Sequence, residues 1–173
     1  NVFKTYKPDI VLHAAAYKHV NLLEQNIIEG VTNNIIGTFN ILKLSNKYKV
    51  QNFLLVSTDK AVRPTNFMGA TKRAMEIALM RSTNTLSMSG ARFANVAYSD
   101  GSLPHGFKKR LENAQPISAP KDIRRYFISA EEAGQLCLLS TLLGENLDIF
   151  FPKLTETLHE ATLKDMAIEF LEG

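Results

Sequence analysis

The sequence lacks most features that mark secreted, membrane-spanning or metal-binding proteins. It has one cysteine, Cys137, which cannot form an internal disulfide, and this predicts a reducing compartment, the cytoplasm. Apolar runs such as residues 10–12 are far below the roughly 20 residues of a membrane helix, and no signal peptide opens the chain. The histidines are scattered without metal-ligand spacing, so no metal site is expected.

A strong charge of either sign is also missing. Lys and Arg number 20 against 17 Asp and Glu, a net charge of +3. The densest basic cluster, Lys108-Lys109-Arg110, is typical of a solvated helix face. A nucleic-acid interface would need a wider basic stripe with aromatics between the charges, so no nucleic-acid partner is expected.

The nine glycines form no GxGxxG or GxxGxxG turn. A dinucleotide-binding sheet needs such a turn, because the pyrophosphate must approach the backbone closely at a helix N-terminus. Either the chain belongs to no dinucleotide enzyme, or the N-terminal third of the fold is absent. The sequence starts at Asn1 and ends abruptly after a helix, and we favour the second alternative, a fragment.

Strand and helix patterns alternate along the chain. Apolar runs predict strands at residues 8–16, 53–57, 91–96 and 148–151, and helical spacing predicts helices at 22–48, 67–81, 103–113, 130–143 and from 162 to the end. Capping-box pairs mark three helix starts: Asn21 with Glu24, Ser129 with Glu132, and Thr162 with Asp165.

Such alternation predicts an α/β fold with a doubly wound parallel sheet, Rossmann-like but lacking its N-terminal Gly-rich strand-turn-helix. We expect a partial dinucleotide-binding domain at residues 1–101. Residues 102–173 are expected to form a small, mixed substrate-binding region with a returning strand and helices. In these sheets ligands bind beyond the carboxyl ends of the strands.

The first predicted strand end carries small residues. Ala14, Ala15 and Ala16 would let a flat cofactor lie against the backbone, and Tyr17 or Lys18 would reach a ligand. Close packing of a helix on the sheet explains the alanines equally well.

The second strand end carries the most polar groups. Ser57, Thr58, Asp59 and Lys60 are consecutive, and Met68 and Lys72 follow on one face of the next helix. An Asp beside a Lys supplies a proton donor and acceptor. A solvated loop is the alternative.

Arginines mark the third strand end and a later segment. Arg92-Phe93 and Arg124-Arg125 each place guanidinium groups near aromatic residues, which suits a diphosphate with a base or sugar. A surface ion pair is the alternative.

Together these motifs resemble the extended short-chain dehydrogenase/reductases, and within them the sugar-nucleotide 4,6-dehydratases of bacterial surface-glycan pathways. The matching segments are His-Ala-Ala-Ala-Tyr-Lys-His-Val at 13–20, residues 33–38, Ser-Thr-Asp-Lys-Ala-Val at 57–62, 64–66, Met-Gly-Ala-Thr-Lys-Arg at 68–73 and Arg-Phe-Ala-Asn-Val at 92–96. The resemblance covers nearly the whole chain.

The resemblance implies bound NAD or NADP, recycled within one turnover, and UDP-N-acetylglucosamine or a related nucleotide-sugar as substrate. It also implies a cytoplasmic homo-oligomer. In its catalytic group Thr58, with Ser57, would hold the sugar C4 hydroxyl, Asp59 would protonate the departing C6 hydroxyl, and Lys60 would take the C5 proton. Lys72 would bind the nicotinamide ribose. Ala14, Ala15, Ala16 and Ser57 would line the cofactor, and Lys18, Asn95 and Arg125 the substrate.

Met68 departs from the wider superfamily, which has Tyr four residues before the lysine. A thioether cannot exchange protons, so oxidation at C4 must use Thr58, a relayed water or a neighbouring group. A sugar-nucleotide 4-epimerase or reductase and a catalytically silent nucleotide-sugar-binding domain therefore stay open as alternatives.

Overall fold

The computed structural model describes residues 1–82, 86–99, 101–153 and 160–172. These residues form two compact units: residues 1–92 with 135–152, and residues 93–134 with 153–173. From the sequence we expected a domain boundary at residue 101, with each of the two regions continuous along the chain. The two units instead interleave, because the chain leaves the first unit at residue 92 and returns to it at residue 135.

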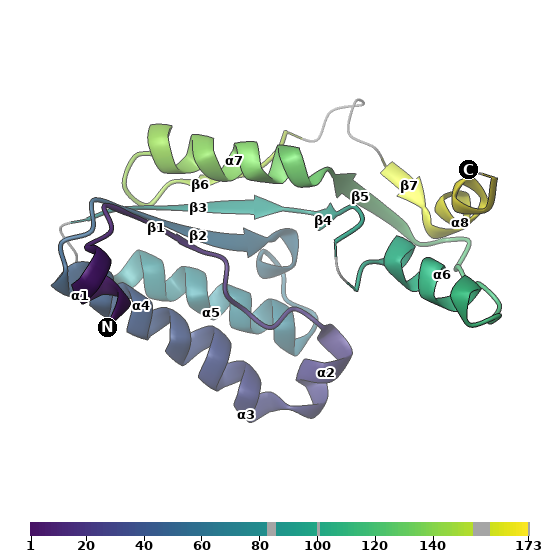
Figure 1. The fold of residues 1–173 in the computed structure, drawn as a ribbon, viewed down its shortest axis with the longest axis horizontal. Coiled ribbons are helices and arrows are strands. Elements are labelled where there is room, and N and C mark those ends of the chain that lie inside the picture. The colour runs from purple at the N-terminus through teal and green to yellow at the C-terminus, as the bar shows by residue number, and fades with distance from the viewer. Residues whose placement is uncertain (83–85, 100, 154–159, 173) are drawn as a thin grey trace. The chain divides into compact units, whose positions relative to one another are not determined.

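The first unit contains a four-stranded sheet in the order β1-β2-β3-β6 (Figure 1). Its strands are β1 (Ile10–His13), β2 (Asn52–Thr58), β3 (Ser87–Phe93) and β6 (Ile149–Phe150). β1 pairs with β2 and β3 pairs with β6, both in parallel. Phe53, Leu54 and Leu55 are all buried, as expected of a parallel strand that is covered on both faces.

Helices cover both faces of this sheet (Figure 1). α4 (Gly37–Lys47) and α5 (Phe67–Arg81) lie on one side, and their apolar residues join the strands in a core that includes Leu42, Met75 and Leu79. α7 (Ala130–Leu143) lies on the other side. There the side-chain amide of Asn52 donates to the Thr141 carbonyl at 2.7 Å, and the Ser89 hydroxyl donates to the Ser140 carbonyl at 2.8 Å.

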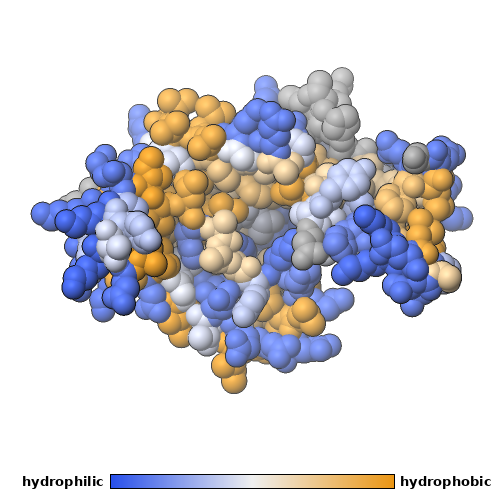
Figure 2. Space-filling view, in the orientation of Figure 1, coloured by the Kyte–Doolittle hydropathy of each residue, from blue (hydrophilic) through white to orange (hydrophobic). Residues whose placement is uncertain are grey.

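Two apolar surfaces of the first unit are exposed to solvent. The sheet-edge strand β1 exposes Ile10 and Leu12. Figure 2 shows hydrophobic side chains along α7, and its exposed leucines are Leu138, Leu139, Leu142 and Leu143.

The second unit contains a three-stranded sheet in the order β4-β5-β7. Its strands are β4 (Asn95–Val96), β5 (Arg124–Ile128) and β7 (Glu160–Thr162). β4 is parallel to β5, and β7 is antiparallel to it. α6 (Leu103–Glu112) and α8 (Leu163–Glu172) pack through Phe107 and Phe170, whose ring centroids are 5.8 Å apart.

The parallel sheet and the helix at 67–81 confirm the predicted fold, but several elements differ. The single helix expected at residues 22–48 is instead four segments: α2 (Val20–Gln25), α3 (Ile27–Gly30), the π-helix η1 (Val31–Ile36) and α4. Asn26 causes the first break, because its backbone leaves the helical region at φ −130° and ψ 58°. The strand expected at 91–96 divides at Ala94 into β3 and β4 of different sheets, and α1 (Val2–Tyr6), β5 and β7 were not predicted.

Two of the three capping boxes are confirmed. The Ser129 hydroxyl accepts from the Glu132 amide at 3.1 Å, and the Thr162 hydroxyl accepts from the Asp165 amide at 3.0 Å. The box at Asn21 and Glu24 is wrong. α2 begins at Val20, and the Glu24 carboxylate instead accepts from the Phe67 amide at the start of α5, at 2.7 Å.

Candidate functional site

The carboxyl end of β2, at Thr58, leads into a single 3-10 turn, η2 (Asp59–Ala61), which carries the polar side chains of Asp59 and Lys60. Asp59 Oδ1 accepts from the Thr58 hydroxyl at 2.7 Å and from the Lys60 amide at 2.9 Å. The Lys60 ammonium lies 3.2 Å from the same oxygen, and the two side chains are 32% and 57% exposed. The acid and the base expected from sequence are therefore in contact and open to solvent.

A close backbone approach holds this turn against the start of α5. A Cβ at Gly69 would lie 2.8 Å from the Lys60 carbonyl oxygen, so a larger residue there would displace the turn. Asn66 caps the helix, since its side-chain oxygen accepts from the Gly69 amide at 2.8 Å. The helix N-terminus and the Asp59-Lys60 turn thus form one rigid corner.

α5 also returns two long polar side chains to the end of β2. Lys72 is 7% exposed, and its ammonium donates to the Val56 carbonyl at 3.0 Å. Glu76, one turn further on, is 1% exposed and accepts from the Ser57 hydroxyl at 2.6 Å. Met68, one turn before Lys72, is buried at 5% exposure. α5 therefore places Lys72 and Glu76 at the end of β2, and Met68 lies one turn before Lys72 on the same helix.

Glu76 is the residue of this site that the sequence reasoning missed. Arg92 makes a double hydrogen bond to its carboxylate, from Nε at 2.7 Å and from Nη2 at 2.6 Å, and Arg73 contacts it at 3.2 Å. The available signal was its spacing, because a residue four positions after Lys72 lies on the same helix face. Arg92 thus forms a largely buried ion pair, whereas the alternative considered from sequence was an ion pair at the surface.

Burial sets the protonation of the lysine. It lowers the pKa of Lys72 from 10.5 to about 8, although the nearby Glu76 charge raises it. Burial alone would raise the pKa of Glu76, but hydrogen bonds from Arg92 and Ser57 outweigh it and hold the pKa below its usual value. At neutral pH the site therefore contains a buried carboxylate and an ammonium that loses its proton in mildly alkaline solution.

The end of β1 leads into a loop that η1 holds in place. Asn34, fully buried in η1, accepts from the Tyr17 amide at 2.7 Å and donates to the Tyr17 carbonyl at 3.0 Å. The Asn34 side-chain amide also donates to the Thr71 hydroxyl on α5 at 3.0 Å. Ala14, Ala15 and Lys18 are exposed on this loop and Ala16 is partly exposed.

His13, the last residue of β1, is buried. Its Nε2 lies 2.9 Å from the Thr38 hydroxyl oxygen, and that hydroxyl donates to the Asn34 carbonyl at 2.6 Å. Because the one hydroxyl proton of Thr38 is donated to Asn34, the Thr38 oxygen accepts from His13, and His13 Nε2 is the donor. Burial, and then the Lys72 charge, lower the pKa of His13, which is therefore neutral at pH 7.

The remaining two predicted residues belong to the second unit. Asn95 of β4 pairs with Phe127 of β5. Arg125 is exposed and lies two residues before Phe127, so side-chain alternation places Asn95 and Arg125 on one face of the small sheet.

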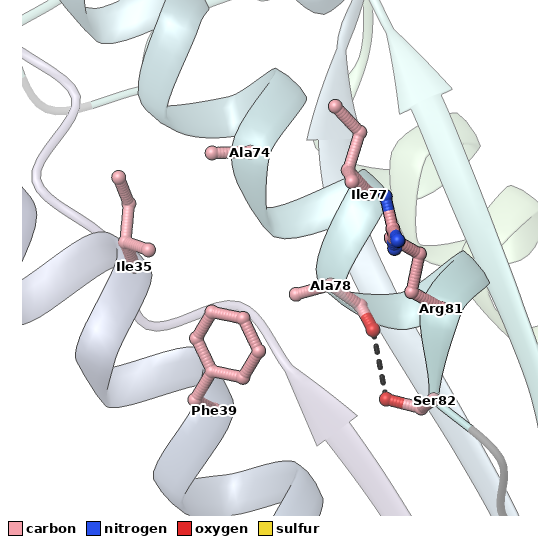
Figure 3. Close-up of a pocket in the computed structure, with 7 residues that line it drawn as sticks. All are labelled: Ile35, Phe39, Ala74, Ile77, Ala78, Arg81 and Ser82. Carbon is pink, nitrogen blue, oxygen red and sulfur yellow. Dashed lines mark hydrogen bonds between the residues drawn. The ribbon is translucent and has the colours of Figure 1, made fainter.

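A cavity of about 380 Å³ lies between η1, α4 and α5, away from these polar groups. Figure 3 shows Ile35 and Phe39 on one side of it, facing Ala74 and Ala78 on the other. Its lining is mainly apolar, with Arg81 and Ser82 at one end, so it contains no acid-base pair for catalysis.

Within the described ranges, no three His, Cys, Asp or Glu side chains are grouped as metal ligands. None of the helices described there is long and apolar enough to cross a membrane.

Comparison with known proteins identifies the family. The family described as "Polysaccharide biosynthesis protein" matches residues 1–172. The chain belongs to this family. Among the curated relatives of the chain, the probable polysaccharide biosynthesis protein EpsC of Bacillus subtilis is 40% identical over 152 residues, which are 86% of the chain and 25% of EpsC.

Two enzymes with named activities are also similar to the chain. The UDP-glucose 4-epimerase of Rickettsia canadensis is 34% identical over 84% of the chain and 44% of the enzyme. The inverting UDP-N-acetylglucosamine 4,6-dehydratase of Campylobacter jejuni is 33% identical over 84% of the chain and 46% of the enzyme. The chain thus spans less than half the length of these three relatives.

The solved structure of Pen from Bacillus thuringiensis superimposes with a TM-score of 0.87 at 28% identity, over 95% of this chain and 51% of Pen. The predicted family and the Rossmann-like fold are confirmed by these comparisons.

Proposed function

We propose that this chain carries the acid-base groups of a nucleotide-sugar 4,6-dehydratase that acts on UDP-N-acetylglucosamine and forms a 4-keto-6-deoxy sugar. The observation that carries the proposal is the contact between Asp59 and Lys60 at the end of β2, beside the helix that bears Lys72. Removal of water needs a proton acceptor at C5 and a proton donor at C6, and this pair supplies both. The related C. jejuni enzyme is named as such a dehydratase.

The residues present fit the nicotinamide end of NAD or NADP. An ammonium has three N–H donors, and the Val56 carbonyl takes one from Lys72, so the others suit ribose hydroxyls. The exposed Ala14 and Ala15 leave the loop after β1 open to a flat ring. The 173 residues contain no Gly-rich turn for the pyrophosphate, and nothing here is assigned to that part of the cofactor.

In the proposed order of proton transfers, Thr58 acts first and the Asp59-Lys60 pair acts second. NAD or NADP, when bound, would supply the hydride acceptor for C4 and the hydride donor for C6. Thr58, with Ser57 beside it, holds the C4 hydroxyl while its proton leaves through Thr58 or a water, because Met68 cannot accept it. Lys60 would first pass a proton to Asp59 across their 3.2 Å contact. The neutral Lys60 would then remove the C5 proton, and Asp59 would donate its proton to the departing C6 hydroxyl, which leaves as water. Lys18, Asn95 and Arg125 are proposed to hold the nucleotide-sugar.

A 4-epimerase is the second candidate, because the R. canadensis relative carries that name. Epimerisation returns the hydride to C4 and releases no water, so it needs no acid and base at C6 and C5. Met68 also argues against it, since tyrosine commonly serves as the C4 base in the wider superfamily.

Incubating the full-length protein with UDP-N-acetylglucosamine and NAD in deuterated water distinguishes the candidates. A dehydratase gives a product 18 mass units lighter before deuterium is counted, with deuterium at C5. An unchanged mass with inverted C4 identifies an epimerase, and neither product supports a binding domain without catalysis.

A further inference from the structure

The carboxylate of Glu76 has partners from three elements. Ser57 at the end of β2, Arg92 on β3 and Arg73 on α5 all donate to it. Arg92 alone neutralises it through a double hydrogen bond and is 18% exposed. The bond from Ser57 is therefore not needed for charge balance, and it reaches the corner where the proposed ligands bind.

This bond decides what Ser57 can offer to a ligand. A serine hydroxyl has one proton, and here that proton points to Glu76 Oε1 at 2.6 Å. The oxygen keeps its lone pairs, so Ser57 accepts a hydrogen bond from a ligand hydroxyl or amide N–H and does not donate one. Without the carboxylate, the hydroxyl would rotate freely and present either polarity.

Glu76 also acts on the lysine one turn before it. Lys72 and Glu76 are four residues apart on α5, and they hold the consecutive β2 residues Val56 and Ser57. The titratable groups acting on Lys72 are Glu76 and, from β1, the neutral His13, while Arg92 of β3 faces Glu76. Among these groups, only Glu76 favours the charged form of Lys72.

We propose that Glu76 is a positioning residue of this site, which presents Ser57 as a hydrogen-bond acceptor and keeps Lys72 charged for cofactor binding. The proposal rests on the NAD binding proposed above. It does not depend on whether the reaction is dehydration or epimerisation.

The test measures the dissociation constant of NAD between pH 6 and pH 9 in the full-length protein. Glu76→Gln removes the charge but keeps an oxygen that accepts from Ser57. The pH at which binding weakens should fall by about one unit, because an opposite charge at this range shifts a pKa by about 1–3 units. The control Arg73→Gln, which removes only a 41%-exposed partner of the same carboxylate, should keep the wild-type profile.

A second variant, Glu76→Met with Arg92→Met, separates the two roles. Replacing both charges of a buried pair by apolar side chains is often well tolerated, so this protein should fold even if Glu76→Gln does not. It should shift the profile in the same direction and, at pH 6 where Lys72 stays protonated, also bind NAD about tenfold more weakly, since Ser57 has lost its acceptor.

A folded Glu76 variant with wild-type NAD affinity at every pH would assign Glu76 to stability alone and overturn the proposal. A wild-type protein that binds NAD but forms no dehydrated product would instead refute the dehydratase and leave this test intact. A full-length protein that binds no NAD would overturn both.

Discussion

The candidate site has two halves that are held in different ways. Its buried half consists of Ser57, Lys72, Glu76 and Arg92, and its exposed half consists of Thr58, Asp59 and Lys60. In the buried half, contacts join residues 16 to 19 positions apart and come from β2, α5 and β3. In the exposed half, Asp59 contacts its chain neighbours Thr58 and Lys60.

Because of this difference, the buried half is expected to contribute to folding stability and the exposed half to the chemical reaction. The buried contacts tie the helix to the sheet, so they form only when the whole unit folds. The exposed contacts are short-range and lie in water, where a single ion pair contributes roughly 0–1 kcal/mol to stability. We therefore expect substitutions in the exposed half to affect turnover without affecting folding, and substitutions in the buried half to affect both.

The largest effect is expected in the exposed half. Asp59→Asn keeps the size of the side chain but cannot deliver a proton, and Lys60→Ala cannot take one. Each should lower the rate of dehydration by about 10² to 10⁴, while the free energy of unfolding changes by less than about 1 kcal/mol.

Single-turnover absorbance of reduced nicotinamide checks this in the full-length protein, because both variants should oxidise C4 and then stall. Urea unfolding supplies the stability comparison. Normal dehydrated product from Asp59→Asn, or wild-type exchange of the C5 hydrogen in Lys60→Ala, would show that the roles are assigned wrongly.

The next effect tests the buried half. Arg92→Ala leaves the carboxylate of Glu76 buried without its main partner, and we expect unfolding to become easier by about 3 kcal/mol. Arg73→Ala removes a half-exposed partner of the same carboxylate and should cost less than about 1 kcal/mol. Equal losses in the two variants would mean that the burial of the pair does not matter.

The third effect is the pH dependence of the buried half. Because the pKa of Lys72 is about 8, its ammonium is present below that pH and is lost above it. NAD binding should therefore weaken as pH rises through about 8, and Lys72→Met should remove this dependence. For folding the sign is opposite: the unfolded lysine keeps its proton up to its usual pKa of 10.5, so the cost of burying the charge declines between about pH 8 and 10.5.

The sequence predicted the exposed half better than the buried half. Consecutive polar residues after an apolar run, such as Thr58-Asp59-Lys60, report a strand end directly, because chain neighbours stay neighbours in the fold. Arg92 and Glu76 come into contact only when α5 packs on the sheet. The sequence around each residue therefore does not indicate its partner. For the same reason the sequence left both a diphosphate contact and a surface ion pair open for Arg92.

The fold shows the same limit. Local signals located β2, α5 and the caps at Ser129 and Thr162, which depend on adjacent residues. They failed at Glu24, whose carboxylate binds the amide of Phe67, 43 positions away. They also failed at Ala94, where the chain passes from one sheet to the other.

The smallest effect is expected at Met68, which belongs to the buried surface of α5 although the resemblance places it at the catalytic position. If it only fills space beside the cofactor, Met68→Leu should keep most of the turnover and change stability by less than about 1.5 kcal/mol, because the two side chains have similar volumes. Steady-state turnover and urea unfolding of the full-length variant measure both. A loss of more than about a hundredfold in rate, roughly 2.7 kcal/mol of barrier, without loss of stability would mean that the sulfur or its shape takes part in the reaction. The buried half would then contain chemistry as well as scaffold, and the division between the two halves would not hold.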